Sequence, residues 1–205
     1  KEAAGLVDGA EQGFQVVGLT YNPETVKTPP TSWADLWNPA YKGRVGITNM
    51  NSTLGTGFMV EIAKMHGGSE ANIDPAFAAI EKLKPNLAAV AANPGALATL
   101  FQQGQIDISP GNFNAIQILK AKGVPVEFVA PKEGAIAFKT TIHIVKNSPN
   151  KELAFKLIEA ALSPEVQAKL MDSPYLIVPT NTKVKMGGEI AKVLAKDTDE
   201  LKKKF

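Results

Sequence analysis

Strand-like and helix-like segments alternate along most of this chain, and that order constrains its fold more than any other feature. Residues 14–21 (FQVVGLTY) and 44–49 (RVGITN) have the composition of strands, and residues 135–145 form a longer strand-like run. Asp74 and Asn93 are each followed by proline, which is typical of a capped first turn of a helix. The alternation predicts an α/β fold with a largely parallel or mixed sheet.

The remaining helices and strands are predicted from residues that cap helices and from residues that end regular structure. Ser32 with Asp35 predicts a short helix with a capping box. Residues 105–109 (QIDIS) predict a strand, followed by a turn at Pro110-Gly111 and then a helix. Two consecutive helices are expected over residues 147–171, the second capped by Ser163, and a last helix from Glu189 to near Lys203.

Composition excludes several classes of protein. The 205 residues are 44% hydrophobic and 20% charged, which is ordinary for a globular protein. The net charge is only +2 with a single arginine, Arg44, so no basic surface for nucleic acid is expected. There is no cysteine and no apolar stretch long enough to cross a membrane. Because the chain starts at Lys1 without a methionine, we expect it to be processed or cut from a longer protein.

A stretch rich in glycine and hydroxyl groups, residues 49–58 (NMNSTLGTGF), connects a predicted strand to a predicted helix. It is not a P-loop, because Phe58 follows Gly57 where that motif has lysine, and it lacks the third glycine of a dinucleotide fingerprint. Free N–H groups at the helix start could still face a ligand. The candidate ligand-binding residues here are Asn51, Ser52, Thr53, Gly55 and Thr56; an ordinary capped turn is the alternative.

A second stretch has the same construction. Residues 107–116 (DISPGNFNAI) end a strand and open a helix with Asn112, Phe113 and Asn114. Asparagine amides both donate and accept hydrogen bonds, which suits a polar ligand, although local capping explains them equally. Two such openings beyond the carboxyl ends of strands indicate a ligand cleft.

No set of residues supports catalysis. His66 and His143 are far apart in the sequence, and neither has a metal-binding spacing with a carboxylate or another histidine. Asp107 has no carboxylate partner that the sequence identifies. The chain is therefore expected not to be an enzyme, and neither a metal nor a cofactor is predicted.

Residues 18–47 (GLTYNPETVKTPPTSWADLWNPAYKGRVGI) strongly resemble solute-binding proteins of bacterial ABC transporters. The similarity continues through GALATLFQQGQIDI, PVEFVAPKEGAI, KNSPNKELAFKLIEAALSPEVQAKLM and YLIVPTN, and so covers Phe14 to about Lys183. The family is that of type II periplasmic binding proteins of the polyamine and iron-related group. The resemblance implies a periplasmic protein that captures a solute by hinge closure between two lobes and delivers it to a permease in the inner membrane.

The resemblance also implies a division of the chain. Residues 14–138 would form the complete second lobe, and residues 1–13 with 139–205 the mostly helical, returning part of an incomplete first lobe. Apolar residues of this part would then lie exposed, namely Leu153, Leu157, Ile158 and Leu170. A swapped homodimer or the missing N-terminal lobe fragment is expected to cover them.

The resemblance also limits which class of solute the chain is expected to bind. Polyamine binders have an aromatic residue and then an acid at the positions of Phe138 and Thr140, so the acid that would hold an ammonium is replaced. Iron binders have adjacent tyrosines where this chain has Asn112 to Asn114. A neutral or anionic small solute is expected, with Phe14, Gln15, Phe138 and Thr140 as further binding residues. A small α/β enzyme acting on a phosphorylated metabolite and a non-catalytic adaptor module remain the alternatives.

Overall fold

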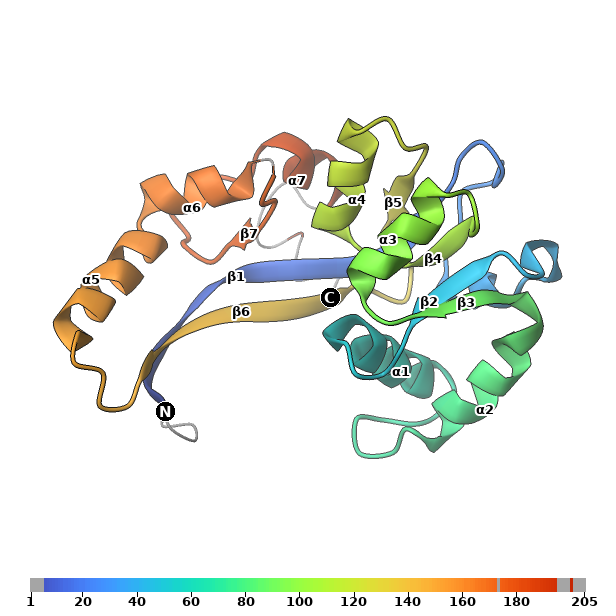
Figure 1. Ribbon diagram of the computed structural model, residues 1–205, viewed down its shortest axis with the longest axis horizontal. Coiled ribbons are helices and arrows are strands. Elements are labelled where there is room, and N and C mark those ends of the chain that lie inside the picture. Colours follow the sequence, from blue (N-terminus) through green and yellow to red (C-terminus); the bar gives the residue numbers. More distant parts are fainter. Residues whose placement is uncertain (1–5, 173, 195–199, 201–205) are drawn as a thin grey trace. The chain divides into compact units, whose positions relative to one another are not determined.

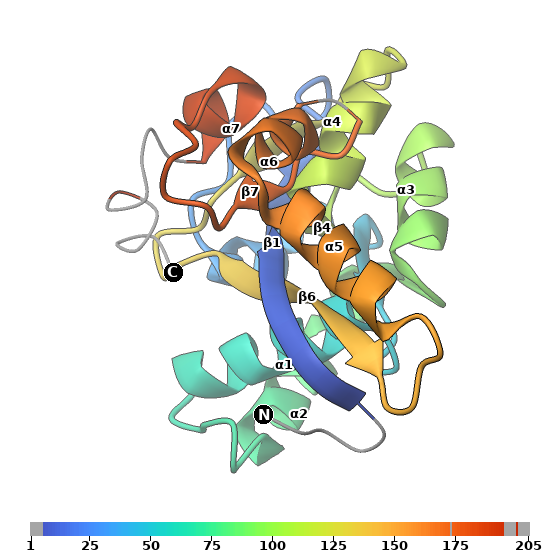
Figure 2. The same cartoon turned by 90° about the vertical axis from the view of Figure 1, so that its left-hand side faces the viewer.

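The computed structural model describes residues 6–172, 174–194 and 200. The chain separates into two compact units (Figures 1 and 2). Within the described residues, unit 2 runs from Val16 to Ile136, and unit 1 joins the chain up to Gln15 with the chain from Ala137 onward. That these units are the two lobes of a binding protein stays a prediction.

Unit 2 is built on a mixed sheet whose strands have the order β3-β2-β4-β1-β5. The strands are β1 (Leu6–Tyr21), β2 (Val45–Thr48), β3 (Leu87–Ala91), β4 (Ile108–Asn112) and β5 (Glu127–Val129). Strand β2 is parallel to β3 and to β4, whereas β1 is antiparallel to β4 and β5. The parallel strands therefore end at one edge of the sheet, where their following helices begin.

Helices cover both faces of this sheet. Helices α1 (Thr53–Met65) and α2 (Asp74–Leu83) lie on one side, and α3 (Pro94–Gln102) and α4 (Phe113–Ala121) on the other (Figure 1). On the side of the sheet covered by α1, the core contains the aromatic rings of Trp33 and Phe58. Both residues are fully buried, and their ring centroids lie 5.7 Å apart. Because the apolar faces of sheet and helices meet in this way, unit 2 has its own core.

The segment that carries much of the family resemblance forms a short 3-10 helix, Trp33–Trp37. Its predicted capping box of Ser32 and Asp35 is confirmed. The indole N–H of Trp33 donates to the carbonyl of Gly134 at 3.0 Å, so this helix is tied to the turn that precedes the strand beginning at Ile136. Trp33 thus stabilises unit 2 in two ways: its ring is buried in the core, and its indole N–H has a hydrogen-bond partner.

Unit 1 contains the first half of β1, which pairs with β6 (Ile136–Val145) and β7 (Val178–Pro179). Figure 2 shows β1 and β6 side by side. Its helices are α5 (Lys151–Leu162), α6 (Pro164–Met171) and α7 (Gly188–Val193). The predicted Ser163 cap of α6 is confirmed by a hydrogen bond from the Val166 N–H.

Helix α5 has no buried residue. Leu153 and Leu157 are 67% and 65% exposed, as the sequence predicted. Ile158 and Leu170 are half-buried, because neighbouring parts of unit 1 cover them in part. No helix of the described part of the chain is both long and apolar enough to span a bilayer.

Several predicted boundaries were wrong. Strand β1 starts eight residues earlier than Phe14, at Leu6. Pro110-Gly111 is not a turn but belongs to β4, where both residues pair with β1. Asp74 is not a cap; Ile73 takes that position, and Asp74 begins α2, where its charge still suits the helix dipole. The predicted last helix is present as α7, which ends at Val193, and most of the predicted continuation to Lys203 lies outside the described residues.

Candidate functional site

Three helices open at the same edge of the unit 2 sheet. Helix α1 follows β2, α3 follows β3 and α4 follows β4, and these three strands run parallel. Each helix start leaves backbone N–H groups without partners inside the helix. The edge beyond the carboxyl ends of parallel strands is where open α/β sheets bind ligands.

At the start of α1, two of the four predicted polar side chains, those of Ser52 and Thr56, have local partners. The Ser52 hydroxyl accepts from the Gly55 N–H at 3.0 Å and lies 3.0 Å from the hydroxyl of Thr48. The Thr56 hydroxyl donates to the carbonyl of Met50 at 2.9 Å. These contacts are those of a capped turn, the simpler of the two interpretations of the sequence.

Thr53 and Asn51 differ from these residues. Both are exposed, and the side chain of Thr53 makes no hydrogen bond to any described residue. Gly55 is buried, and a Cβ there would overlap the carbonyl of Asn49, so only glycine permits this close approach. Of the predicted hydroxyl groups at this opening, the one on Thr53 is thus available to a ligand.

The start of α4 places its three predicted residues in different surroundings. Asn112 is the last residue of β4, and its Oδ1 atom is buried without a partner among the described residues. Phe113 is buried in the core, with its ring edge-on to Phe128 at 5.2 Å. The Asn114 side chain accepts from the Ala115 N–H at 2.9 Å. Asn112 is thus the member of this group with an unused polar atom.

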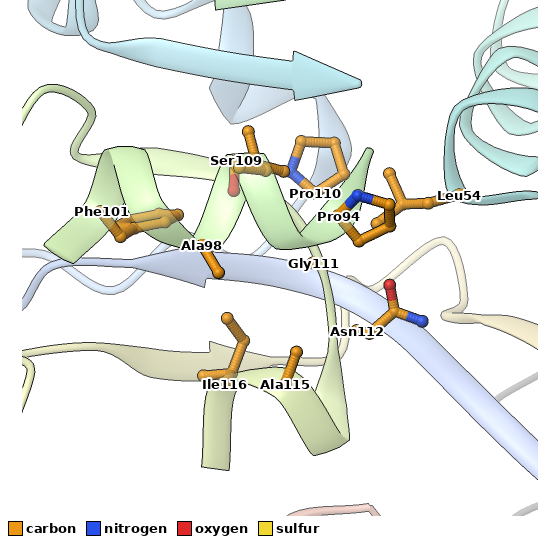
Figure 3. Close-up of a pocket in the computed structure, with 11 residues that line it drawn as sticks. Leu54, Pro94, Ala98, Phe101, Ser109, Pro110, Gly111, Asn112, Ala115 and Ile116 are labelled. Carbon is orange, nitrogen blue, oxygen red and sulfur yellow. The ribbon is translucent and has the colours of Figure 1, made fainter. Parts of the chain in front are cut away.

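A hollow lies where the three helix openings meet (Figure 3). Its empty volume of about 250 Å³ includes space open to solvent. It is lined by one residue of α1, four of α3, the last four of β4 and two of α4: Leu54, Pro94, Leu97, Ala98, Phe101, Ser109, Pro110, Gly111, Asn112, Ala115 and Ile116. Among the predicted site residues, Asn112 lines this hollow.

The contribution of α3 was missed by the sequence analysis. Asn93 caps this helix by accepting from the Ala96 N–H, in the same construction as the opening of α1. That repeated pattern was the signal that could have added Pro94 and Ala98 to the site. The sequence could not predict that Ser109 is buried, because a serine in a strand can equally well lie on a solvent-exposed face.

Four predicted residues lie in unit 1. Phe14 and Gln15 belong to β1, and Phe138 and Thr140 to β6, where they are two positions apart and so share a face. All four are half-buried. Their part in binding stays a prediction.

The ionisable groups with shifted pKa values lie outside the hollow. Burial is the main factor that raises the pKa of Glu61, and the nearby carboxylate of Glu133 adds to it. Burial also tends to raise the pKa of Asp107, but hydrogen bonds and the charge of Arg44 outweigh it, so this pKa lies below its usual value. The described residues include no cluster of three potential metal ligands.

The comparison with known families decides the class of protein. The model of the bacterial extracellular solute-binding protein family matches residues 12–204. The chain belongs to this family of solute-binding proteins. The family is one of binding proteins and not of enzymes, in agreement with the sequence analysis.

Among curated relatives of this solute-binding protein, the spermidine/putrescine-binding periplasmic protein of Escherichia coli is 31% identical over 163 residues, 77% of this chain and 44% of its own length. A periplasmic protein of Salmonella typhi named for 2-aminoethylphosphonate binding is 28% identical over 162 residues, 76% of this chain and 47% of its own length. The chain therefore spans less than half the length of these relatives.

Solved structures confirm the predicted type II periplasmic-binding-protein fold. An ABC transporter protein from Clostridium perfringens is 34% identical with a TM-score of 0.73, over 92% of this chain and 59% of that chain. The periplasmic binding protein P5PA is 26% identical with a TM-score of 0.72, over 94% of this chain and 63% of that chain.

Proposed function

We propose that this protein is the solute-binding component of an ABC importer, which captures a small polar solute in the periplasm and delivers it to a permease in the inner membrane. The proposal is supported chiefly by one observation: the N-termini of three helices lie together at one edge of the sheet, in a chain that belongs to this family. Free N–H groups and the positive ends of helices favour polar or anionic groups there.

Unit 2 and unit 1 correspond, in this proposal, to the second lobe and the returning part of the first lobe. The rest of the first lobe would come from a segment outside this sequence or from a swapped copy of the chain. Solute contacts to both lobes would stabilise a closed form, which the permease recognises. The solute can shift this equilibrium only through a higher affinity for the closed form.

The proposed solute is neutral or anionic. Thr140 stands where polyamine-binding relatives are expected to have an acid, so no carboxylate is available at that position to hold an ammonium. The helix openings supply donors rather than acceptors. One relative is named for 2-aminoethylphosphonate, a compound with an anionic phosphonate group, which supports a solute of this chemistry.

Calorimetry on the assembled protein, with the rest of the first lobe present, tests the proposal. The panel is putrescine, spermidine, ferric iron, 2-aminoethylphosphonate, inorganic phosphate and a neutral sugar. We expect binding of a phosphonate, phosphate or neutral compound and none of the two amines or iron. Tight binding of putrescine, or of iron, would contradict the proposed solute class.

A matched pair of variants tests the helix opening. Thr53→Ala removes an exposed hydroxyl that has no partner in the described part of the chain, and we expect it to weaken binding by about tenfold, the effect of losing one good hydrogen bond. Thr99→Ala, on the exposed side of α3, is the control and should leave affinity unchanged. Equal affinities of Thr53→Ala, Thr56→Ala and the unchanged protein would mean that residues 49–58 are only a capped turn.

A further inference from the structure

The carboxylate of Glu133 joins the turn before β6 to the short 3-10 helix of unit 2. The hydroxyl of Ser32 donates to its Oε1 atom, and the backbone N–H of Trp33 donates to its Oε2 atom at 3.3 Å. Ser32 is the N-cap of this helix, so Glu133 binds the residue at which the helix starts. Because a carboxylate only accepts hydrogen bonds, each of its oxygen atoms suits one of these two donors.

Two backbone groups of the same turn strengthen this connection. The N–H of Lys132 donates to the carbonyl of Thr31 at 2.8 Å. The carbonyl of Gly134 accepts from the indole N–H of Trp33 at 3.0 Å. These two hydrogen bonds and the two made by the carboxylate together form what we call the Glu133 clamp. Its groups come from segments about a hundred residues apart in the sequence, so the clamp is a tertiary contact and not a local cap.

The turn that carries Glu133 has a defined shape of its own. It is closed by the Gly134 N–H, which donates to the carbonyl of Pro131 at 3.0 Å. The φ angle of Gly134 is 115°, a conformation that glycine adopts far more readily than other residues. Pro131 and Ala135, at the two ends of the turn, are both buried. A turn of fixed shape that is held in this way sets the direction in which the chain leaves it.

The segment that leaves the turn is strand β6. It begins at Ile136, where the described part of unit 2 ends. Phe138 and Thr140, two of the predicted solute-binding residues, follow on the same strand. Because an extended strand rises about 3.3 Å per residue, a change in its starting direction displaces both side chains. Their placement therefore depends on the clamp.

We propose that Glu133 is a positioning residue for solute binding, which fixes the start of β6 and thereby Phe138 and Thr140 without contacting the solute itself. The assignment rests on the proposed function and deepens it, because it adds a residue on which affinity depends from outside the predicted site. Since the clamp belongs to unit 2, the turn moves with this unit during closure, and any bending of this crossing occurs beyond Ala135.

The indole N–H signals of the two tryptophans test the clamp in the 205-residue chain without any solute. Glu133→Leu removes both carboxylate acceptors, so we expect the Trp33 indole N–H to exchange with deuterium at least about tenfold faster. The Trp37 indole donates instead to the carbonyl of Ala79 and should keep its exchange rate. Unchanged exchange at Trp33, or equal acceleration at both indoles, would contradict the clamp.

Calorimetry on the assembled protein, with the same solute panel, tests the positioning role. We expect Glu133→Leu to weaken binding about tenfold, and Glu133→Ala replaces it if that variant does not fold. Glu133→Gln should restore the affinity, because its amide oxygen can accept from the Trp33 N–H while its NH₂ group donates to the Ser32 hydroxyl, which also accepts. Glu24→Leu is the control, since Glu24 is exposed and no described residue bonds to its side chain.

The outcomes separate the two proposals. If a solute of the panel binds with equal affinity in the presence and absence of Glu133→Leu, the positioning role is wrong and the binding function stands. If Glu133→Gln weakens binding as much as Glu133→Leu does, the charge and not the clamp matters, and the positioning role is again wrong. If no member of the panel binds the unchanged protein, the proposed function fails, and the positioning role fails with it.

Discussion

At the scale of single residues, the Arg44 side chain joins three other residues of unit 2 by hydrogen bonds. Its guanidinium donates to both carboxylate oxygens of Asp107, at 2.7 and 2.9 Å, and to the carbonyls of Gly104 and Gln105. The side chain of Asp107 is only 11% exposed. A carboxylate so placed depends on Arg44, because without it Asp107 would be buried with no counter-charge and only the Thr25 hydroxyl as a side-chain partner.

We expect Arg44→Met to lower the free energy of unfolding by about 2 kcal/mol at pH 7, the size of a charged hydrogen bond. Since the pKa of Asp107 is lowered in the folded protein, its contribution is complete above the ordinary aspartate value of about 4 and is lost as the pH falls through the folded value. Urea unfolding at pH 7 and pH 3 measures the difference, which should shrink at the lower pH.

Lys84→Met is the control for this experiment. Lys84 forms an ion pair with Glu81, but their side chains are 62% and 66% exposed, so its loss should change the free energy of unfolding by less than about 0.5 kcal/mol. If Arg44→Met lowers the free energy of unfolding by no more than Lys84→Met does, or by more at pH 3 than at pH 7, the stabilising role of the Arg44–Asp107 pair is wrong.

At the scale of elements, Gln167 holds three parts of unit 1 together. It lies in α6, is 1% exposed, and donates to the carbonyl of Gln12 in β1 at 2.6 Å. Its carbonyl oxygen accepts from the N–H groups of Thr180 and Asn181, each at 2.9 Å. One amide thus connects a helix, a strand and the segment that follows β7.

We expect Gln167→Leu to destabilise unit 1 by about 2 kcal/mol, because it removes the partner of the partly buried N–H groups of Thr180 and Asn181 and of the Gln12 carbonyl. Amide hydrogen exchange measures the effect unit by unit, and unit 2 should keep its protection. Gln117→Leu in α4 is the control, since no described residue bonds to its side chain. Uniform loss of protection across both units would contradict a local role for Gln167.

The elements also show how far the sequence alone could predict this molecule. Helix starts marked by Ser32, Asn93 and Ser163 were predicted correctly, because capping is a local interaction between neighbouring residues. The sequence predicts a turn at Pro110 and Gly111, because both residues are typical of turns. Their place in β4 depends on pairing with β1, which is distant in the sequence.

The candidate site was predictable to a smaller extent. The openings of α1 and α4 were found from their glycines and asparagines, and Asn112 does line the hollow. Ser109 could not be found, because its burial follows from strand register alone. The side chains of Ser52 and Thr56 looked available in the sequence, but both are used in hydrogen bonds of the turn.

At the scale of the whole molecule, α5 presents an apolar surface without a described partner. Leu153, Leu157 and the nearby Val145 are 67%, 65% and 62% exposed, and α5 buries none of its residues. Exposed apolar side chains that recur on one helix face usually mark an interaction site. The proposed missing part of the first lobe, or a swapped copy, would cover this surface.

We expect the 205-residue chain on its own to associate in a concentration-dependent manner, which sedimentation velocity measures. The double variant Leu153→Lys and Leu157→Lys should shift it to the monomer, because charges oppose burial of this face. The pair Lys156→Leu and Glu159→Leu, at exposed polar positions of the same helix, should not do so. A chain that is monomeric without any substitution would contradict the need for a covering partner.

The division of the chain has a consequence for biosynthesis. Within the described residues, unit 2 is one uninterrupted segment, Val16–Ile136, whereas unit 1 needs residues from both sides of it. A ribosome therefore releases this segment before β6, α5, α6 and α7 are complete. Domains fold as they emerge, so unit 2 can complete its sheet first while the start of β1 waits for its later partners. Nascent chains stalled soon after Ile136 would carry one folded body and one unpaired strand.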